Sequence, residues 1–397
     1  MSPSDHTQAV HAGREDFSAL GVHAPPLDFS STYPVPHLEE GVASLDAFME
    51  GAASAANPIY ARLFNPTVAN FEKALADLEN ANDSIAYASG MAATTAALMA
   101  TRIIDADTPR NHIVAMRPMY GGTDHLLSTG LLGFEVTWTD AAGLADALRK
   151  DTALVMVETP ANPTLKLTDI AAVVKTAGNI PVMVDSTFAT PILQKPLDLG
   201  AAIVMHSATK FLGGHGDVLA GVVATNDQKW AAALRQVRIV TGANLHPMAA
   251  WLCLRSMPTL PMRVERASET AADLAERLAK HPGIAKVHYP GTDHPLVGSQ
   301  MKSGGSLISF EIHGNAQTAG TLMKHVQLCT PAVSLGSTDT LIQHPAGLTH
   351  RVVDEKTKLE AGITENLIRL SIGLESADDI WADLTQALQA SAADHVA

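Results

Sequence analysis

The side chain best suited to chemistry lies in the segment 205–217, which reads Met-His-Ser-Ala-Thr-Lys-Phe-Leu-Gly-Gly-His-Gly-Asp. Lys210 follows an apolar run of strand length at 201–204, with two hydroxyl residues before it and glycines after it. Burial at such a place lowers the pKa of an ammonium group, and the freed lone pair can form a Schiff base. A surface lysine before a turn would give the same local pattern.

A carboxylate stands at the end of another apolar run, because Asp185 closes the segment 182–185. In a parallel sheet this place lies in the ligand crevice at the carboxyl ends of the strands. A carboxylate there can keep a pyridinium nitrogen protonated, which makes pyridoxal phosphate an electron sink. Aspartates at strand ends also bind metals and cap helices, so Asp185 alone does not decide the chemistry.

Two segments have the residue types that bind phosphate. Ser89, Gly90 and Met91 join an expected strand to an expected helix, so that backbone N–H groups at the helix start would face an anion. An ordinary serine cap with a glycine turn would look the same. Arg62, in the run Tyr-Ala-Arg-Leu-Phe-Asn-Pro-Thr at 60–67, offers a planar fork that matches phosphate geometry.

Two further side chains suit a cofactor and its substrate. Tyr120 precedes a Gly-Gly pair, where its ring can lie on a cofactor ring and its hydroxyl can donate a proton. Arg369 lies inside the apolar run 367–373 and needs an anionic partner, since an unpaired buried charge is costly. A substrate carboxylate and a structural Asp or Glu satisfy that need equally well.

The elements that must position these residues alternate between apolar strands and helices from residue 60 to about 255. We expect strands at 84–88, 112–117, 134–138, 153–158, 182–185, 201–206 and 218–224, and helices at 68–79, 91–101 and 170–176. This alternation predicts an α/β domain with a mostly parallel sheet covered by helices on both faces.

The chain ends in a second, smaller α+β domain, for which we expect helices at 263–280 and 378–391 and strands at 304–312 and 367–374. We therefore divide the chain into three parts: an N-terminal arm at 1–57, which contacts a neighbouring subunit, a large cofactor-binding domain at 58–255, and a substrate-side domain at 256–397. The arm is irregular except for a short amphipathic stretch at 38–49.

Composition narrows the class of protein. Of 397 residues, 46% are hydrophobic and 17% are charged, which is the balance of a globular chain. The 27 basic and 41 acidic residues give a net charge of −14, which argues against a nucleic-acid partner. We expect no membrane partner, since the charge-free stretches are interrupted by polar residues. The two cysteines and the lack of a signal sequence suit the cytoplasm, and the 17 histidines show no metal-ligand spacing, so we expect no metal.

Together and in this order, the segments resemble the Cys/Met metabolism (transsulfuration) family of pyridoxal-phosphate enzymes. The resemblance extends from residue 60 to 373, and its most specific part is the run Ser-Ala-Thr-Lys-Phe-Leu-Gly-Gly-His-Gly-Asp at 207–217. It implies fold type I of the pyridoxal-phosphate-dependent transferases. It also implies a homotetramer of catalytic dimers, with each site between two chains.

The resemblance also implies a role for each candidate residue. Lys210 would bind the cofactor covalently and act as the base, Asp185 would pair with the pyridine nitrogen, Thr187 would lie near the ring oxygen, and Tyr120 would stack on the ring and act as a proton donor. The remaining cofactor contacts would come from Ser89, Gly90, Met91, Ser207 and Thr209, with Tyr60 and Arg62 reaching over from the neighbouring subunit. The substrate carboxylate would be bound by Asn162, Thr340 and Arg369.

The implied activity is γ-elimination of a sulfur amino acid, of the methionine or cystathionine γ-lyase type, giving a thiol, 2-oxobutanoate and ammonia. γ-Replacement, of the cystathionine γ-synthase or O-acyl-homoserine sulfhydrylase type, is the alternative. Individual residues favour different members of this set of activities. Gly122 stands where methionine γ-lyases typically have cysteine, whereas the runs 214–217 and 341–346 look closer to methionine γ-lyases. A non-catalytic cofactor-binding protein on the same scaffold is a third possibility.

Overall fold

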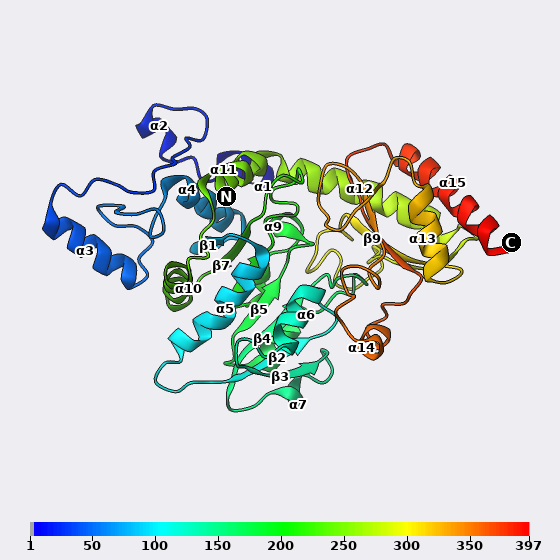
Figure 1. The fold of residues 1–397 in the computed structure, drawn as a ribbon, viewed down its shortest axis with the longest axis horizontal. Coiled ribbons are helices and arrows are strands. Elements are labelled where there is room, and N and C mark those ends of the chain that lie inside the picture. Colours follow the sequence, from blue (N-terminus) through cyan, green and yellow to red (C-terminus); the bar gives the residue numbers. More distant parts are fainter. Residues whose placement is uncertain (1–3, 397) are drawn as a thin grey trace.

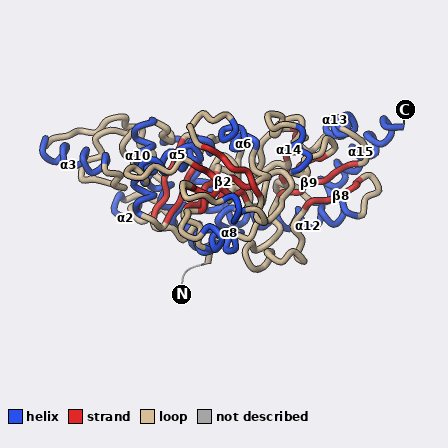
Figure 2. The backbone as a smooth tube through the Cα atoms, turned by 90° about the horizontal axis from the view of Figure 1, so that it is seen from below, coloured by secondary structure: helices blue, strands red, loops and turns tan. Residues whose placement is uncertain are grey.

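The computed structural model describes residues 4–396. The molecule is elongated, with helix α3 (Leu38–Met49) at one end and helix α15 (Ala377–Val396) at the other (Figure 1). Between them lie two sheets, which form separate groups of strands along the long axis (Figure 2). A larger and a smaller sheet with helices agree with the predicted fold class, which is confirmed.

The larger sheet, built within residues 4–396, has seven strands in the order β1-β7-β6-β5-β4-β2-β3. The strands are β1 (Asp83–Tyr87), β7 (Gly221–Thr225), β6 (Ile203–His206), β5 (Val182–Asp185), β4 (Thr152–Glu158), β2 (His112–Met116) and β3 (Glu135–Thr139). Strand β7 is antiparallel to both its neighbours, and the pairs from β6 to β3 are parallel. The parallel strands therefore end at one common edge, where Glu158, Asp185 and His206 are the last strand residues.

Helices cover both faces of this sheet because successive strand residues point to opposite sides. Helices α5 (Gly90–Ile104) and α10 (Gln228–Thr241) share a core with Ile113 and Met183. On the other face, the neighbouring residues Val114 and Val184 pack with α8 (Ile170–Ala177) and α7 (Leu144–Ala147). The remaining helices of this part are α4 (Pro66–Leu78), α6 (Gly121–Ser128), α9 (Thr190–Leu193), α11 (Pro247–Ser256) and the 3₁₀ turns Pro196–Leu199 and Met257–Thr259.

The smaller sheet has five strands among the described residues, in the order β10-β11-β12-β9-β8. They are β10 (Thr330–Pro331), β11 (Leu341–Gln343), β12 (Leu367–Ser371), β9 (Leu307–Ile312) and β8 (Ile284–His288). Ile368 and Leu370 point into a core made with α12 (Leu260–Ala279), α13 (Ala316–His325) and α15. Arg369, between them, therefore points to the opposite face.

Helix α12 connects the two cores. Val264 in its first half belongs to the core of the large domain, and Leu274 in its second half belongs to the core of the small one. The short helix α14 (Glu355–Glu360) has no buried residue. Sharing one 20-residue helix restrains the small sheet relative to the large one.

The N-terminal part is more regular than expected. It forms α1 (Asp5–His11), α2 (Phe17–Leu20) and α3, and only α3 matches a segment singled out in the sequence. Helix α1 contacts α12 and the 3₁₀ turn at 257–259, so the chain start packs on its own subunit. The three-part division of the chain stays a prediction. Across residues 4–396, no helix is both long and apolar enough to cross a membrane.

Candidate active site

A cavity of about 450 Å³ opens where the parallel strands of the large sheet end, beside the loop 333–335 of the small domain. Its walls contain most of the residues that the sequence singled out. These are Ser89, Gly90, Met91, Tyr120, Asn162, Asp185, Thr187, Ser207, Thr209, Lys210 and Arg369. Segments far apart in the chain thus meet at the edge that the strand pattern predicted.

Lys210 extends into this cavity, and its Nζ donates a hydrogen bond to Ser334 Oγ at 2.7 Å. Burial, together with the positive charge of Arg369, lowers the pKa of Lys210 to about 8. A substantial fraction of the amine is therefore neutral near physiological pH and can act as a nucleophile. The alternative of a surface lysine does not fit this environment.

Asp185 lies at the carboxyl end of β5 and is held by the residue two places on. Its Oδ1 accepts from Thr187 N at 3.0 Å and from Thr187 Oγ1 at 2.6 Å, and Ser207 N donates to the same hydroxyl at 2.9 Å. Burial raises the pKa of Asp185, while the Thr187 hydrogen bonds and the nearby His206 act in the opposite sense. A cationic ring nitrogen at this carboxylate would offset its desolvation, which is the chemistry that a pyridinium supplies.

The N-terminus of α5 forms another wall of the cavity. Ser89 caps the helix, because its Oγ accepts from Ala92 N at 3.1 Å. Two glycines allow the backbone to come this close. A Cβ on Gly90 would lie 2.8 Å from Ser207 Cβ, and a Cβ on Gly221 would lie 2.1 Å from Ser89 O. Orphan N–H groups of a 15-residue helix and the hydroxyls of Ser207 and Thr209 therefore line one cradle, which fits a phosphate.

Arg369 is fully buried and is bound by neutral acceptors. Its Nη1 donates to Asn162 Oδ1 at 2.8 Å, and its Nη2 donates to Ser334 O at 2.7 Å. Within residues 4–396, the acceptors found for its guanidinium are these neutral groups and not an Asp or Glu carboxylate. Burial lowers the pKa of Arg369 to about 9, against the opposing charge of Glu158. The structural carboxylate partner left open by the sequence is therefore not in contact, and the guanidinium can receive a carboxylate from the cavity.

Ser334 and Glu158 line the cavity next to the predicted residues, and the sequence analysis missed them. Ser334 has a positive φ of 96°, a conformation rarely adopted outside glycine, and it contacts both Lys210 and Arg369. Glu158 ends β4, and burial followed by the charge of Asp185 raises its pKa. The position of Glu158 at a strand end, next in the sheet to Asp185, is a signal that could have found it.

Three predicted residues lie outside the lining of the cavity. Thr340 is fully buried, and its Oγ1 donates to Glu375 Oε2 at 2.8 Å while accepting from Gly373 N at 3.0 Å. Arg62 is exposed and its Nη1 donates to Ile239 O at 2.8 Å, and Tyr60 is 45% exposed. The individual roles assigned to all these residues stay predictions.

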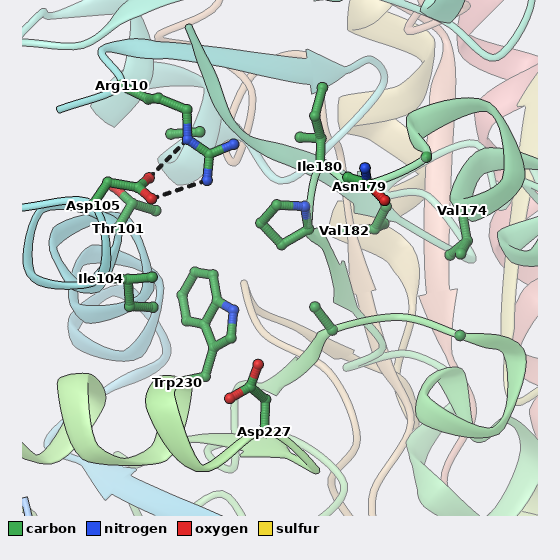
Figure 3. A pocket seen from close by; sticks show the side chains of 15 residues that line it. Thr101, Ile104, Asp105, Arg110, Val174, Asn179, Ile180, Val182, Asp227 and Trp230 are labelled. Carbon is green, nitrogen blue, oxygen red and sulfur yellow. Dashed lines mark hydrogen bonds and ion pairs between the residues drawn. The ribbon is translucent and has the colours of Figure 1, made fainter. Parts of the chain in front are cut away.

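A second cavity of about 310 Å³ lies at the opposite edge of the large sheet, where β5 begins (Figure 3). Its charged groups have structural partners, since Arg110 Nε donates to Asp105 Oδ2 at 2.9 Å and Asp227 Oδ1 accepts from Lys229 N at 2.7 Å at the start of α10. Among the described residues, no group of three or more His, Cys, Asp or Glu side chains is placed to hold a metal ion. The candidate chemistry is therefore concentrated in the first cavity.

Comparison with known proteins agrees with this site. The family model of the Cys/Met metabolism PLP-dependent enzymes matches residues 6–389. L-methionine gamma-lyase of Streptomyces avermitilis is 52% identical over 96% of this chain and 88% of its own, and that of Brevibacterium sandarakinum is 52% identical over 98% of both chains. The structure of cystathionine gamma synthase from Xanthomonas oryzae pv. oryzae in complex with aminoacrylate and cysteine aligns over 99% of this chain and 100% of its own. The TM-score is 0.90 and the identity 33%.

The fold and the cavity are those of an enzyme that uses pyridoxal 5′-phosphate (PLP), with a buried lysine of lowered pKa at the end of a parallel sheet. The chain belongs to the Cys/Met metabolism family of PLP-dependent enzymes. The predicted family and the predicted cofactor are therefore both confirmed.

The pKa of Lys210 gives a testable pH dependence. Because the neutral amine combines with the cofactor, we expect the rate at which apoenzyme recombines with PLP to rise with pH through about 8. The substitution Arg369→Gln removes a positive charge and is expected to move this midpoint to higher pH. The control Arg369→Lys retains the charge and is expected to leave the midpoint unchanged. Stopped-flow absorbance of the cofactor at a series of pH values measures the midpoint in both variants. An unchanged midpoint in Arg369→Gln would contradict the contribution of the Arg369 charge to the lowered pKa, which burial lowers independently.

Proposed function

We propose that this enzyme catalyses the γ-elimination of L-methionine to methanethiol, 2-oxobutanoate and ammonia. The relatives named L-methionine gamma-lyase, at 52% identity over nearly the whole chain, support this choice. One feature of the cavity also supports methionine as the substrate. Leu219, Val333 and Leu348 line the cavity and are 69%, 53% and 47% exposed, so they offer an apolar surface to an uncharged thioether. The charged distal end of cystathionine would find no partner on these three side chains.

The substrate is bound at its carboxylate and oriented by the side chains around Lys210. Arg369 donates to the carboxylate, with Asn162 beside it, as its neutral acceptors leave its charge available. The N-terminus of α5, with Ser207 and Thr209, would hold the phosphate of the cofactor, and Asp185 would pair with its ring nitrogen. A substrate bound in this way would present its Cα–H bond to Nζ of Lys210, which lines the same cavity.

Proton transfers are assigned to two side chains. Bound PLP supplies an electron sink that stores the pair released when the Cα–H bond breaks. Lys210 Nζ accepts the Cα proton and returns it to the bound substrate–cofactor pair, and the amine, neutral again, then accepts a Cβ proton. Its hydrogen bond to Ser334 keeps the amine in the cavity. As the Cγ–S bond breaks, the Tyr120 hydroxyl donates a proton to the leaving sulfur. Water completes the reaction and releases 2-oxobutanoate and ammonia.

γ-Replacement is the second candidate, and one observation favours it. The likeness to cystathionine gamma synthase, with a TM-score of 0.90, extends over the whole chain, and the same residues would serve both reactions. The two candidates differ in whether a thiol attacks the substrate after its γ-substituent has left.

A substrate panel distinguishes the two reactions. We expect purified holoenzyme to release 2-oxobutanoate from methionine without any added thiol. We expect release from cystathionine to be at least about tenfold slower, because its charged end would meet the apolar side chains of Leu219, Val333 and Leu348. Colorimetric detection of the 2-oxo acid measures both. The control is O-acetyl- or O-succinyl-homoserine with and without a thiol. If no 2-oxobutanoate is released from methionine and an acyl-homoserine is consumed only when a thiol is present, γ-elimination is contradicted and γ-replacement is favoured.

We further propose that the active unit is a dimer, within a homotetramer located in the cytoplasm. Three observations support the contact between subunits. Tyr60 is 45% exposed, Arg62 beside it is exposed, and α3 has apolar residues that are 42% to 78% exposed. A neighbouring subunit would cover this surface and receive Tyr60 and Arg62 at its phosphate cradle.

The proposed cytoplasmic location is supported by the cysteines. Cys253 and Cys329 are buried free thiols, which suits a reducing compartment.

Subunit complementation tests the shared site. Arg62→Ala and Lys210→Ala are each expected to be nearly inactive alone. When the two are unfolded together and refolded, a mixed dimer regains one site with an intact Lys210 and an intact Arg62. Random mixing then restores roughly a quarter of the wild-type activity. Activity that stays at the level of the parents would mean that each site is built from one chain.

A further inference from the structure

Glu158 is a buried carboxylate at the cavity for which the proposed reaction has no use. It is 7% exposed and ends β4, directly beside Asp185 in the parallel sheet. Its two oxygens accept from different segments of the chain. Oε2 accepts from Tyr120 N at 2.6 Å, and Oε1 accepts from Asn162 N at 2.7 Å. A burial as costly as this one requires such charge-assisted hydrogen bonds.

The first of these hydrogen bonds fixes the start of α6. Tyr120 is the N-cap residue of that helix, and its side chain is 40% exposed, so packing restrains its ring only in part. The ring lies close over Gly122, where an added Cβ would be 2.5 Å from Tyr120 Cε1. The backbone of Tyr120 therefore largely sets where the ring stands in the cavity, and Glu158 holds that backbone.

The second hydrogen bond fixes the acceptor of Arg369. Asn162 is 3% exposed, and its Oδ1 accepts from Arg369 Nη1 at 2.8 Å. The negative charge of Glu158 also acts on the Arg369 guanidinium without a direct contact. One carboxylate thus orients both the residue over the cofactor ring and the pair that would bind the substrate carboxylate.

We propose that Glu158 is a positioning residue that couples Tyr120 to the Asn162–Arg369 pair, so that one side chain sets both ends of the reacting geometry. The proposal rests on the roles given above to Tyr120 and Arg369. An amide cannot replace the carboxylate here, because one end of a glutamine is an NH₂ group that would face a backbone N–H. The substitution Glu158→Gln therefore loses one of the two anchors together with the charge.

The test compares Glu158→Gln holoenzyme with wild type in three measurements. We expect kcat/KM for methionine to fall about 10- to 100-fold, with kcat lowered and KM raised, since both ends of the substrate site move. We expect the visible circular dichroism of the bound cofactor to change, since it reports the position of Tyr120 on the ring. In the double variant with Tyr120→Phe, the loss is smaller than the product of the single losses.

Asp383→Asn is the matched control. Asp383 is also 7% exposed, and its carboxylate accepts from the backbone N–H groups of Gln327, Leu328 and Cys329 at 2.7, 3.0 and 2.8 Å. It does not line the cavity. We expect Asp383→Asn to lower the melting temperature while kcat, KM and the cofactor dichroism stay at wild-type values.

The outcomes separate this proposal from the proposed reaction. If wild-type enzyme fails to cleave methionine, the γ-elimination proposal fails, and the cofactor dichroism of Glu158→Gln still tests the positioning role. Should Glu158→Gln not fold, Glu158→Asp keeps the charge but is too short for both anchors, and the same dichroism and KM changes are expected. Wild-type dichroism, or a loss fully multiplicative with that of Tyr120→Phe, would overturn the proposal.

Discussion

The structure depends on how one fully buried charge, the guanidinium of Arg369, is satisfied. It extends from the small sheet and donates to Asn162 of the large domain and to Ser334 of the adjoining loop. Leaving a buried donor without its hydrogen-bond acceptors costs about 1–3 kcal/mol, and more for a charged group, so these two acceptors favour one relative position of the two domains. The same charge lowers the pKa of Lys210, which links the substrate end of the cavity to its reactive amine.

The cavity owes its other features to the edge of a parallel sheet. Strand ends place Glu158 and Asp185 side by side, while the glycines at 90 and 221 let the start of α5 approach Ser207. These are constraints of backbone geometry, and they would hold before any ligand arrives. In a preorganised site of this kind, the hydrogen-bond donors and charges are already oriented when the ligand binds. They can therefore stabilise charge on the reacting groups without the cost of rearranging the protein.

The sequence predicted those residues whose environment follows from their own strand or turn. Lys210 and Asp185 were found because each follows an apolar run, and the edge of a parallel sheet then brings them together. Ser334 could not be found in this way, since its role depends on a positive φ and on contact with a lysine 124 positions away. Thr340 follows the family pattern, yet its hydroxyl is used by Glu375 outside the cavity lining. Helix α1 was missed because it packs on α12, a contact that local pattern does not reveal.

We propose that Lys210 is the residue that combines with the cofactor, and covalent trapping tests this assignment most directly. Reduction of the purified holoenzyme with borohydride, followed by digestion and mass mapping, locates the trapped cofactor on the chain. We expect a single modified peptide containing Lys210 in the wild-type enzyme, and no modified peptide in the variant Lys210→Ala. A trapped cofactor on any other lysine, or an equal yield from Lys210→Ala, would contradict it.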